Sequence, residues 1–193
     1  MARKRIGSSQ AWVELLAQDI EAVSAFTVAK ARIAAALRLK NLRRFRFFEL
    51  SGPLPSRAEQ EDLLHRSTQF YNPHKERCAL RMTAGDPAPL LPGERAVLVV
   101  EREGVRRTAA ERWWRHETGD DVEVREGTTW GLILDDGAAG EIEDLALVRE
   151  RRHGLLCNPH SQDCRLAGDV VPLPWLGEPA RPAARPRATR SRE

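Results

Sequence analysis

The chain has 193 residues, of which 41% are hydrophobic and 31% charged, a composition typical of a folded protein with a modest core. No stretch approaches the roughly 20 consecutive apolar residues of a membrane helix, and the first ten residues, MARKRIGSSQ, lack the apolar run of a secretory signal. Three cysteines are too few, and odd in number, for a disulfide framework. We therefore expect a cytoplasmic protein without a membrane partner.

The net charge of +3 is unevenly distributed along the chain. Residues 1–10 contribute +3 and residues 181–193 contribute +4, which leaves −4 for residues 11–180. Nucleic-acid-binding domains usually gather Lys and Arg on their folded surface. A nucleic-acid partner is therefore not expected for the body of the protein.

The first half of the chain predicts the order strand, helix, strand, helix, strand. Short apolar or aromatic runs mark the strands, and good helix formers with a capping box at Ser56 and Glu59 mark the helices. The predicted elements, in chain order, are Trp12–Ala17, Val28–Leu39, Arg44–Leu50, Ser56–Tyr71 and Arg77–Met82.

The second half repeats this order after a linker. The segment Thr83–Gly93 contains three prolines and two glycines, which is typical of a connection between two units. Gly119 is predicted to cap a helix, and Glu126-Gly127 to form the turn of a hairpin. The predicted elements are Ala96–Val100, Thr108–Glu117, Asp121–Arg125, Thr129–Leu134, Gly140–Leu156 and Cys164–Leu166.

The C-terminal segment is rich in Pro, Ala and Arg from about Val170 onward, which indicates a largely disordered tail whose start, Leu173–Leu176, docks on the body. The expected organisation is a basic N-terminal arm (1–10), a first unit (11–83), a linker (84–93), a second unit (94–168) and a Pro/Arg-rich tail (169–193).

An internal repeat is the most informative feature. The pattern Asn72-Pro73-His74-x-x-x-Cys78 recurs 86 residues later as Asn158-Pro159-His160-x-x-x-Cys164. Periods of this length indicate duplicated domains. We predict an α+β fold of two tandem ferredoxin-like β-α-β-β-α-β units, which form an intramolecular pseudo-dimer with antiparallel sheets. Each unit is expected to cover the open sheet face of the other.

The second unit resembles a known family. The run from Val124 to Leu134, VREGTTWGLIL, is similar to the Val-Arg-x-Gly-Lys hairpin of PurS, the small subunit of phosphoribosylformylglycinamidine synthase. That family continues with an alternating strand, a helix and an Asn-Pro before the last strand. Leu42-Arg43, followed by an aromatic strand and Asn72-Pro73, looks like a divergent first copy. Thr128 stands where the family has its lysine.

The resemblance implies a non-catalytic accessory subunit of a purine-biosynthesis complex. That complex makes formylglycinamidine ribonucleotide, using ATP and ammonia released from glutamine. The implied partners are a glutaminase subunit and an ATP-dependent synthetase subunit, and self-association stays open. The sequence also lacks a phosphate-binding P-loop and a nucleophile elbow. We expect the chain to carry no catalytic residues and no cofactor of its own.

The candidate partner interface combines the motif of the second unit with both repeated turns. Its residues are Arg125, Gly127, Asn72, Pro73, His74, Asn158, Pro159 and His160. Alternatively, Asn72 and Asn158 end helices in the left-handed conformation that Asn tolerates.

Other readings of the sequence remain open. His74, Cys78, His160 and Cys164 form a four-ligand zinc site if the pseudo-twofold axis brings them together, or are small buried side chains and helix caps. Trp113, Trp114 and Trp130 stack on a ligand, or pack beneath the tail with Trp175. The acidic residues of segment 135–144 stabilise a helix start or hold magnesium. The alternative functions are a duplicated ferredoxin-like module that contacts nucleic acid through basic tails, and a small metal-binding regulator.

Overall fold

The computed structural model describes residues 5–103, 105–135, 139–148, 154–168 and 170–176. Over these residues the protein is α+β, with a single six-stranded antiparallel sheet in the strand order β3-β1-β2-β5-β4-β6. The elements are β1 (Arg5–Leu15), α1 (Ile20–Arg32), the 3-10 helix η1 (Ala34–Arg38), β2 (Leu39–Leu54), α2 (Arg57–Arg66), β3 (Glu76–Arg81), β4 (Arg95–Glu101), α3 (Thr108–Thr118), β5 (Glu123–Leu134), α4 (Ala139–Ala146) and β6 (Gln162–Ala167).

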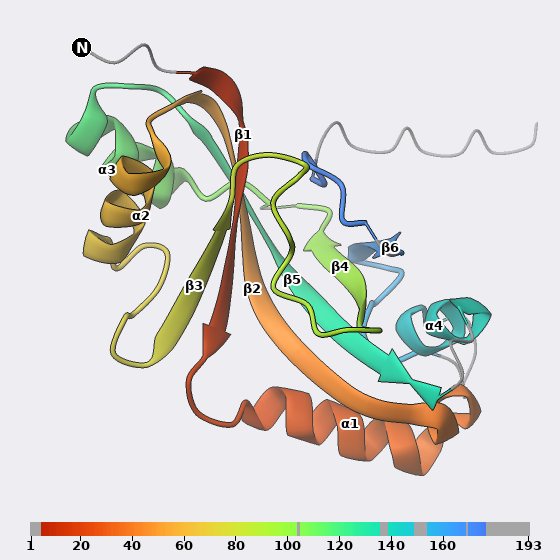
Figure 1. Ribbon diagram of the computed structural model, residues 1–193. Coiled ribbons are helices and arrows are strands. Elements are labelled where there is room, and N and C mark those ends of the chain that lie inside the picture. Colours follow the sequence, from red (N-terminus) through yellow and green to blue (C-terminus); the bar gives the residue numbers. More distant parts are fainter. Residues whose placement is uncertain (1–4, 104, 136–138, 149–153, 169, 177–193) are drawn as a thin grey trace, which may run out of the picture.

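The two halves join edge to edge rather than face to face. Each half supplies three strands, and the long central strands β2 and β5 pair with each other across the junction (Figure 1). The expected stacking of one unit on the open face of the other is therefore wrong. The order of elements within each half is β-α-β-α-β, one strand fewer than the ferredoxin-like order.

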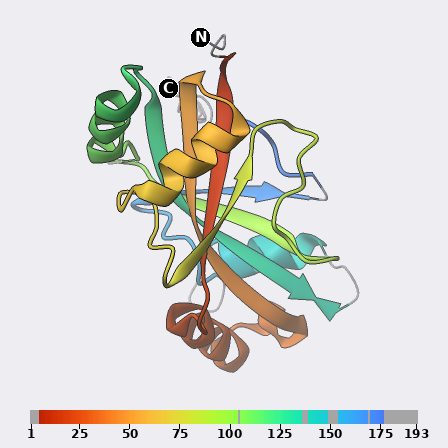
Figure 2. The same cartoon turned by 60° about the vertical axis from the view of Figure 1, so that its left-hand side comes forward.

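The four α-helices in the described part of the chain cover one face of the sheet, here called the helix face. Helices α1 and α4 pack on one end of it, with Leu42, Val97 and Leu132 beneath them. Helices α2 and α3 pack on the other end, over Phe48 and Val124. Figures 1 and 2 show these two helix pairs at opposite ends of the twisted sheet. Each pair takes one helix from each half, so the two halves share both cores.

The opposite face is covered by chain segments instead of helices. Residues 170–176, here called the C-terminal strap, place Val171, Trp175 and Leu176 against Trp12 and other apolar side chains of this strap face. Ala88 and Leu90 of the proline-rich linker pack beside them. The expected docking of the start of the tail is confirmed, and residues 177–193 lie outside the described residues.

The pairing register repeats between the halves. Val13 of β1 lies opposite Cys78 of β3, and 86 positions later Val99 of β4 lies opposite Cys164 of β6. Val13 also pairs with Arg46 of β2, as Val99 does with Thr128 of β5. Arg46 and Thr128 also pair with each other. The approximate twofold axis that relates the two halves of the sheet therefore passes between these two residues.

The predicted hairpin at Glu126-Gly127 is wrong. Strand β5 runs through both residues without a break, and Gly127 lies opposite Phe47 in the pairing with β2. The glycine is needed for close packing instead of a turn, since a Cβ atom there would lie 2.8 Å from Val100 Cγ1.

Several element boundaries also differ from those predicted. Helix α1 begins at Ile20 rather than Val28, because the Asp19 side chain accepts hydrogen bonds from two backbone N–H groups of the first turn. Helix α4 ends at Ala146 rather than continuing to residue 156, and Leu147 forms a β-bridge with Cys157. The capping box of Ser56 and the left-handed cap at Gly119 are confirmed.

Strand β1 includes residues that the sequence assigned to a basic N-terminal arm. Arg5 pairs with Leu54, and the pairing continues along the whole of β1. The polar residues Ser9 and Gln10 are fully buried there. Their side chains bond to Gln60 and Glu49, which compensates for the loss of water.

Candidate functional site

A polar groove lies on the helix face between the two helix pairs. It holds a cavity of about 320 Å³, and its lining includes Arg44 of β2, Glu126, Thr128 and Trp130 of β5, and Gln162 of β6. The strands alternate their side chains between faces, so these residues share the helix face with the two apolar clusters. The groove is therefore the polar centre of an otherwise apolar surface.

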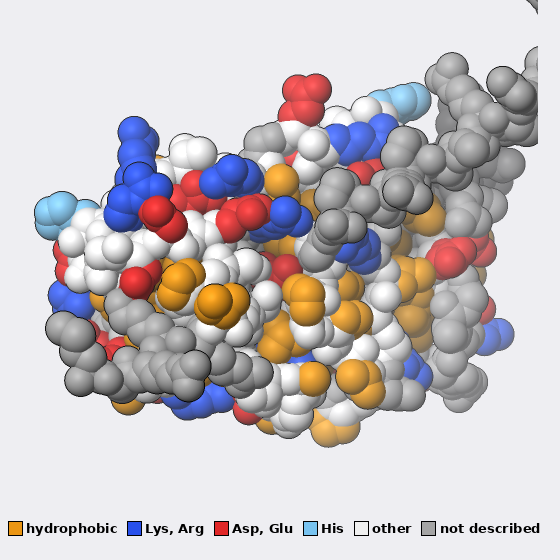
Figure 3. All heavy atoms as spheres, turned by 90° about the horizontal axis from the view of Figure 1, so that it is seen from above, with side chains coloured by type: hydrophobic (Ala, Val, Ile, Leu, Met, Phe, Trp, Pro, Cys, Tyr) orange, Lys and Arg blue, Asp and Glu red, His pale blue; other side chains and the backbone are white. Residues whose placement is uncertain are grey.

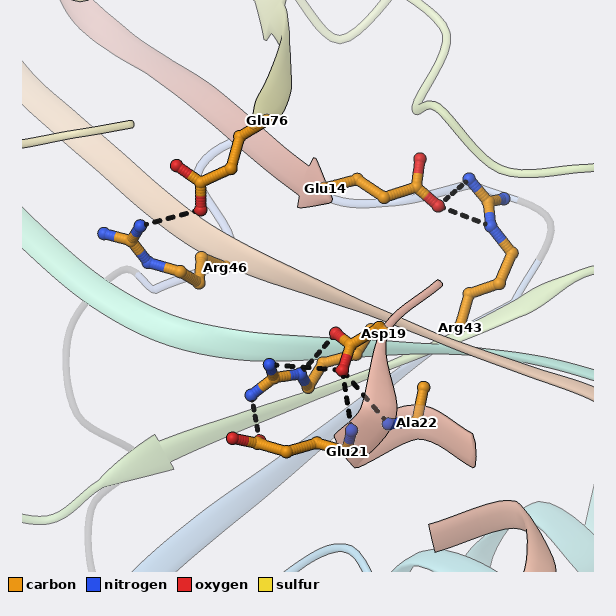
Figure 4. Close-up of polar contacts among 8 residues, drawn as sticks. Glu14, Asp19, Glu21, Ala22, Arg43, Arg46 and Glu76 are labelled. Carbon is orange, nitrogen blue, oxygen red and sulfur yellow. Dashed lines mark hydrogen bonds and ion pairs between the residues drawn. The ribbon is translucent and has the colours of Figure 1, made fainter. Parts of the chain in front are cut away.

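Arg44 is held at the groove by the start of α1. Its Nε donates to Asp19 Oδ2 over 2.8 Å, and its guanidinium also pairs with Glu21. Asp19 accepts in addition from the backbone N–H groups of Glu21 and Ala22, at 2.9 and 3.2 Å (Figure 4). One carboxylate thus both begins the helix and fixes the arginine.

Arg46, one pleat further along β2, is held by both halves of the protein. Its Nη1 donates to Glu76 Oε1 over 3.2 Å (Figure 4), and its Nε lies 3.9 Å from Glu126 Oε1. Arg107 pairs with the same Glu126 over 2.6 Å. The arginines in and beside the groove are thus compensated by carboxylates from the start of α1, from β3 and from β5.

A second ionic cluster lies on the strap face. Arg43 Nη2 lies 2.7 Å from Glu14, and its Nη1 lies 2.9 Å from Glu94, whose side chain is fully buried. Burial raises the pKa of Glu94, although Leu91 N–H and Arg43 stabilise its charged form. Arg77 adds a second cation beside Glu14. This cluster ties β1, β2, β3 and the linker together.

The strongest pKa shifts lie away from both clusters. Burial raises the pKa of Cys78 and of Cys164 to about 12, which leaves little of the reactive thiolate at neutral pH. Burial also raises the pKa of Tyr71 beside Cys78. These shifts have a structural cause and do not activate a nucleophile.

The two Asn-Pro-His turns have the same hydrogen bonds. Asn72 Oδ1 accepts from His74 N–H over 3.0 Å, and Asn158 Oδ1 accepts from His160 N–H over the same distance. In both turns the Asn carbonyl also accepts from the first residue of the following strand, over 2.8 Å. Asn72 lies beyond the end of α2 and Asn158 beyond the end of α4. The expectation that these residues end helices is wrong, because they form the turns that start β3 and β6.

The four-ligand metal site is wrong. Cys78 lies on β3 and Cys164 on β6, the two opposite edges of the sheet. Five strand spacings separate these edges, or about 24 Å. Among the described residues, no group of three or more His, Cys, Asp or Glu side chains is arranged to hold a metal ion.

The predicted interface residues therefore lie at three separate places. Pro73 and exposed His74 belong to the turn at one edge, and Pro159 and exposed His160 to the turn at the other. Arg125 and Gly127 lie in central strand β5 on the strap face. Arg125 pairs with Glu123 and donates to the Leu176 carbonyl over 2.9 Å, so it anchors the strap.

The tryptophans pack within the protein. Trp114 is fully buried between α2 and α3, and Trp113 lies beside it on the same cluster. Trp130 packs on the cluster at the other end. Trp175 stacks on Trp12 at 6.0 Å between ring centroids, rather than on the other three.

The acidic segment 135–144 is only partly described. Asp135 pairs with Lys40, and Glu141 lies 3.4 Å from Arg38. Both pairs tie the start of α4 to the chain around η1. Asp136 lies outside the described residues.

Sequence reasoning missed the residues that hold the strap. Glu49 is 2% exposed and accepts from the N–H groups of Trp175 and Leu176, at 2.6 and 3.0 Å. Gln10 donates to the Pro172 carbonyl over 2.7 Å, and buried Arg81 to the Val171 carbonyl over 3.2 Å. The one sequence signal was a lone carboxylate, Glu49, within an aromatic strand.

Searches against protein-family models, curated proteins and solved structures found no match. Within the described ranges, every helix is too short or too polar to span a lipid bilayer.

Proposed function

We propose that the chain is a non-catalytic accessory subunit that bridges a glutaminase and an ATP-dependent synthetase of a phosphoribosylformylglycinamidine synthase complex. In this proposal the chain is a tandem of two PurS-like units, fused into an intramolecular pair. The observation that carries the proposal is the repeat of strand order, register and turn hydrogen bonds between the halves.

The register supports a divergent first copy of the family motif. Arg46 of β2 and Thr128 of β5 occupy equivalent positions in the two halves. Equivalent residues of β2 and β5 are therefore 82 residues apart in the sequence. The same shift places Leu42-Arg43 on Val124-Arg125, the pair with which the resemblance begins. The two segments that look alike in sequence therefore occupy equivalent positions in the sheet.

The shift also bears on the lysine that this chain lacks. Thr128 stands at that position in the second half, and its counterpart in the first half is Arg46. Arg46 lies opposite Thr128 in the pairing of β2 with β5. Of the two equivalent positions, the one in the first half thus has a cationic side chain, Arg46, and the one in the second half has Thr128.

The order of elements after the motif supports the same proposal. The rest of β5 is followed by α4, the Asn158-Pro159 turn and β6. In the first half, β2 is followed by α2, the Asn72-Pro73 turn and β3. Apart from the family's hairpin, in whose place β5 runs without a break, this is the order that the resemblance implies, and it occurs twice.

The surface charge favours a protein partner over nucleic acid. Many arginines pair with carboxylates, including Arg44, Arg46, Arg77 and Arg107. Figure 3 shows Lys and Arg side chains intermixed with Asp and Glu on the face seen from above. Such paired charges weaken the attraction for a phosphate backbone.

The test is affinity purification of the full chain from its native cell, followed by identification of the proteins that co-elute. We expect a glutaminase and an ATP-dependent synthetase. The exposed turns provide matched variants, His74→Ala and His160→Ala, each of which leaves the Asn side-chain hydrogen bond to the backbone intact. Loss of a different enzyme in each variant would show that the two edges bind different partners. Recovery of the folded chain without either enzyme, or with nucleic acid that salt removes, would contradict the proposal.

A further inference from the structure

Two of the three cysteines lie against each other in the second half. Cys157, just before the Asn158 turn, and Cys164, in edge strand β6, pack in the same apolar cluster, and each thiol lies close enough to shift the pKa of the other. Cys157 is 1% exposed, whereas Cys164 is half-buried. All three cysteines of the chain are free thiols.

The repeat provides an internal comparison for this pair. The 86-residue shift places Tyr71 on Cys157 and Cys78 on Cys164. Tyr71 and Cys78 likewise pack together in the cluster under α2 and α3. The same local geometry thus joins a tyrosine and a thiol in one half, and two thiols in the other.

We propose that Cys157 and Cys164 form a reversible intramolecular disulfide when the protein meets a peroxide or a small-molecule disulfide. This proposal does not depend on the proposed function. It concerns a covalent modification of the second half alone, since the first half has a single cysteine.

The reaction balances with hydrogen peroxide as the oxidant. The Cys164 thiol first loses its proton, and the thiolate attacks one peroxide oxygen and breaks the O–O bond. The products are a sulfenic acid and hydroxide, and the hydroxide takes up the released proton to become water. The Cys157 sulfur then attacks the Cys164 sulfur, loses its proton and expels the hydroxyl group as a second water. Two thiols are oxidised to one disulfide and one peroxide is reduced to two waters. Cys164 reacts first because it is the more exposed.

Burial raises the pKa values of both thiols, and this limits the rate at which they are oxidised. Thiolate is scarce at neutral pH, so oxidation is slow there and accelerates with rising pH.

The disulfide would fasten α4 to the edge of the sheet. Cys157 N–H donates to the Ala146 carbonyl at the end of α4 over 2.9 Å, and Leu147 pairs with Cys157. Cys164 lies opposite Val99 within the sheet. A bond between the two sulfurs therefore joins the connection after α4 to β6 covalently.

The experiment treats the purified full chain with hydrogen peroxide or oxidised glutathione, without denaturant. Free thiols are then counted, and the linked peptides identified by mass spectrometry. We expect two of the three thiols to disappear, a mass loss of two hydrogen atoms, and a peptide pair joining Cys157 to Cys164. Dithiothreitol should restore all three thiols.

Cys78→Ser is the matched control and should keep the crosslink, whereas Cys164→Ser should abolish it. Tyr71→Cys copies the pair into the first half and should add a second crosslink, to Cys78. Peptide mapping of the unaltered chain decides the matter even where a variant fails to fold. Three free thiols after prolonged oxidation, a disulfide that forms only in urea, or links between chains in place of Cys157–Cys164 would overturn the proposal.

Discussion

The backbone N–H of Trp175 donates a hydrogen bond of 2.6 Å to the buried carboxylate of Glu49, 126 residues earlier in the chain. The next N–H, that of Leu176, donates to the other carboxylate oxygen over 3.0 Å. A carboxylate that accepts from two consecutive amides fixes the direction of the segment that supplies them. Glu49 is thus the anchor of the C-terminal strap.

Replacement of this anchor should destabilise the protein. Glu49→Ala leaves two buried N–H groups without their acceptor and removes one of the two acceptors of the Gln10 amide, which we expect to lower the free energy of unfolding by about 3 kcal/mol. Urea titration followed by tryptophan fluorescence measures this loss. Glu49→Gln keeps the size and one acceptor oxygen and should lose less. An unchanged urea midpoint for Glu49→Ala would show that the strap does not depend on this carboxylate.

Truncation should separate the strap from the rest of the tail. A chain that ends at residue 179 retains Trp175, which is 4% exposed and stacks on Trp12, and should keep its melting temperature. A chain that ends at residue 169 loses this ring and uncovers the strap face, at a cost of about 3–5 kcal/mol for the tryptophan alone. Calorimetry of both chains provides the comparison. Equal melting temperatures would contradict the packing of the strap.

Gly127→Val should be destabilising by about 1–3 kcal/mol, the usual cost of overpacking. A Cβ at this position would lie 2.8 Å from Val100 Cγ1 and 3.1 Å from the Val99 carbonyl oxygen. Gly85→Ala is the matched control, because its nearest neighbour would lie 3.7 Å away, at Thr83 Oγ1. Thermal unfolding of both variants measures the difference. A neutral Gly127→Val would show that β4 and β5 can separate at low cost.

The halves should not fold separately. Each helix pair draws one helix from each half, so residues 1–86 alone would expose half of both clusters. We expect each half to lack a cooperative unfolding transition and the mixed halves to regain one, as followed by circular dichroism. In the full chain, cleavage within the linker 84–93 should leave the two fragments associated on gel filtration. Cooperative unfolding of residues 1–86 alone would contradict the shared cores.

Stability should fall in alkaline solution through the buried thiols. The pKa of Cys78 is raised from 9.0 to about 12, so between these values the unfolded chain loses a proton that the folded chain keeps. The free energy of unfolding therefore decreases as pH rises through this window. For each such thiol, the equilibrium constant of unfolding increases by up to about tenfold per pH unit. Cys78→Ala should reduce the slope measured by urea titration between pH 9 and 11. An identical slope would show that the Cys78 thiol ionises normally.

The sequence predicted those parts of the fold that depend on local chemistry. The capping box at Ser56, the cap at Gly119 and the α+β class were correct, because each follows from residue types at fixed spacing. The repeat of Asn-Pro-His correctly marked equivalent positions, since both copies make the same turn.

The remaining features depend on partners distant in the chain. Ser9 and Gln10 form part of a buried strand only because Gln60, Glu49 and Arg81 satisfy them, which no hydropathy pattern reveals. The sequence suggested a turn at Gly127. The actual reason for the glycine is the close approach of β4, a strand that is distant in sequence and leaves no room for a Cβ atom. The edge-to-edge junction of β2 and β5 was missed because the alternation of apolar residues along a strand indicates which face of the sheet is buried. It does not indicate which strands pair with each other.

A pair assembled from two identical chains must present every surface feature twice, whereas a single chain whose halves share the same order of strands and helices need not do so. Helix α1 exposes Ile20 and Val23 to solvent, and its counterpart α3 exposes Arg115 and His116. The opposite ends of one symmetric framework have thus acquired unlike surfaces. Because the two halves differ in sequence while their strands pair in the same register, a substitution at one end of the sheet is not imposed on the other end.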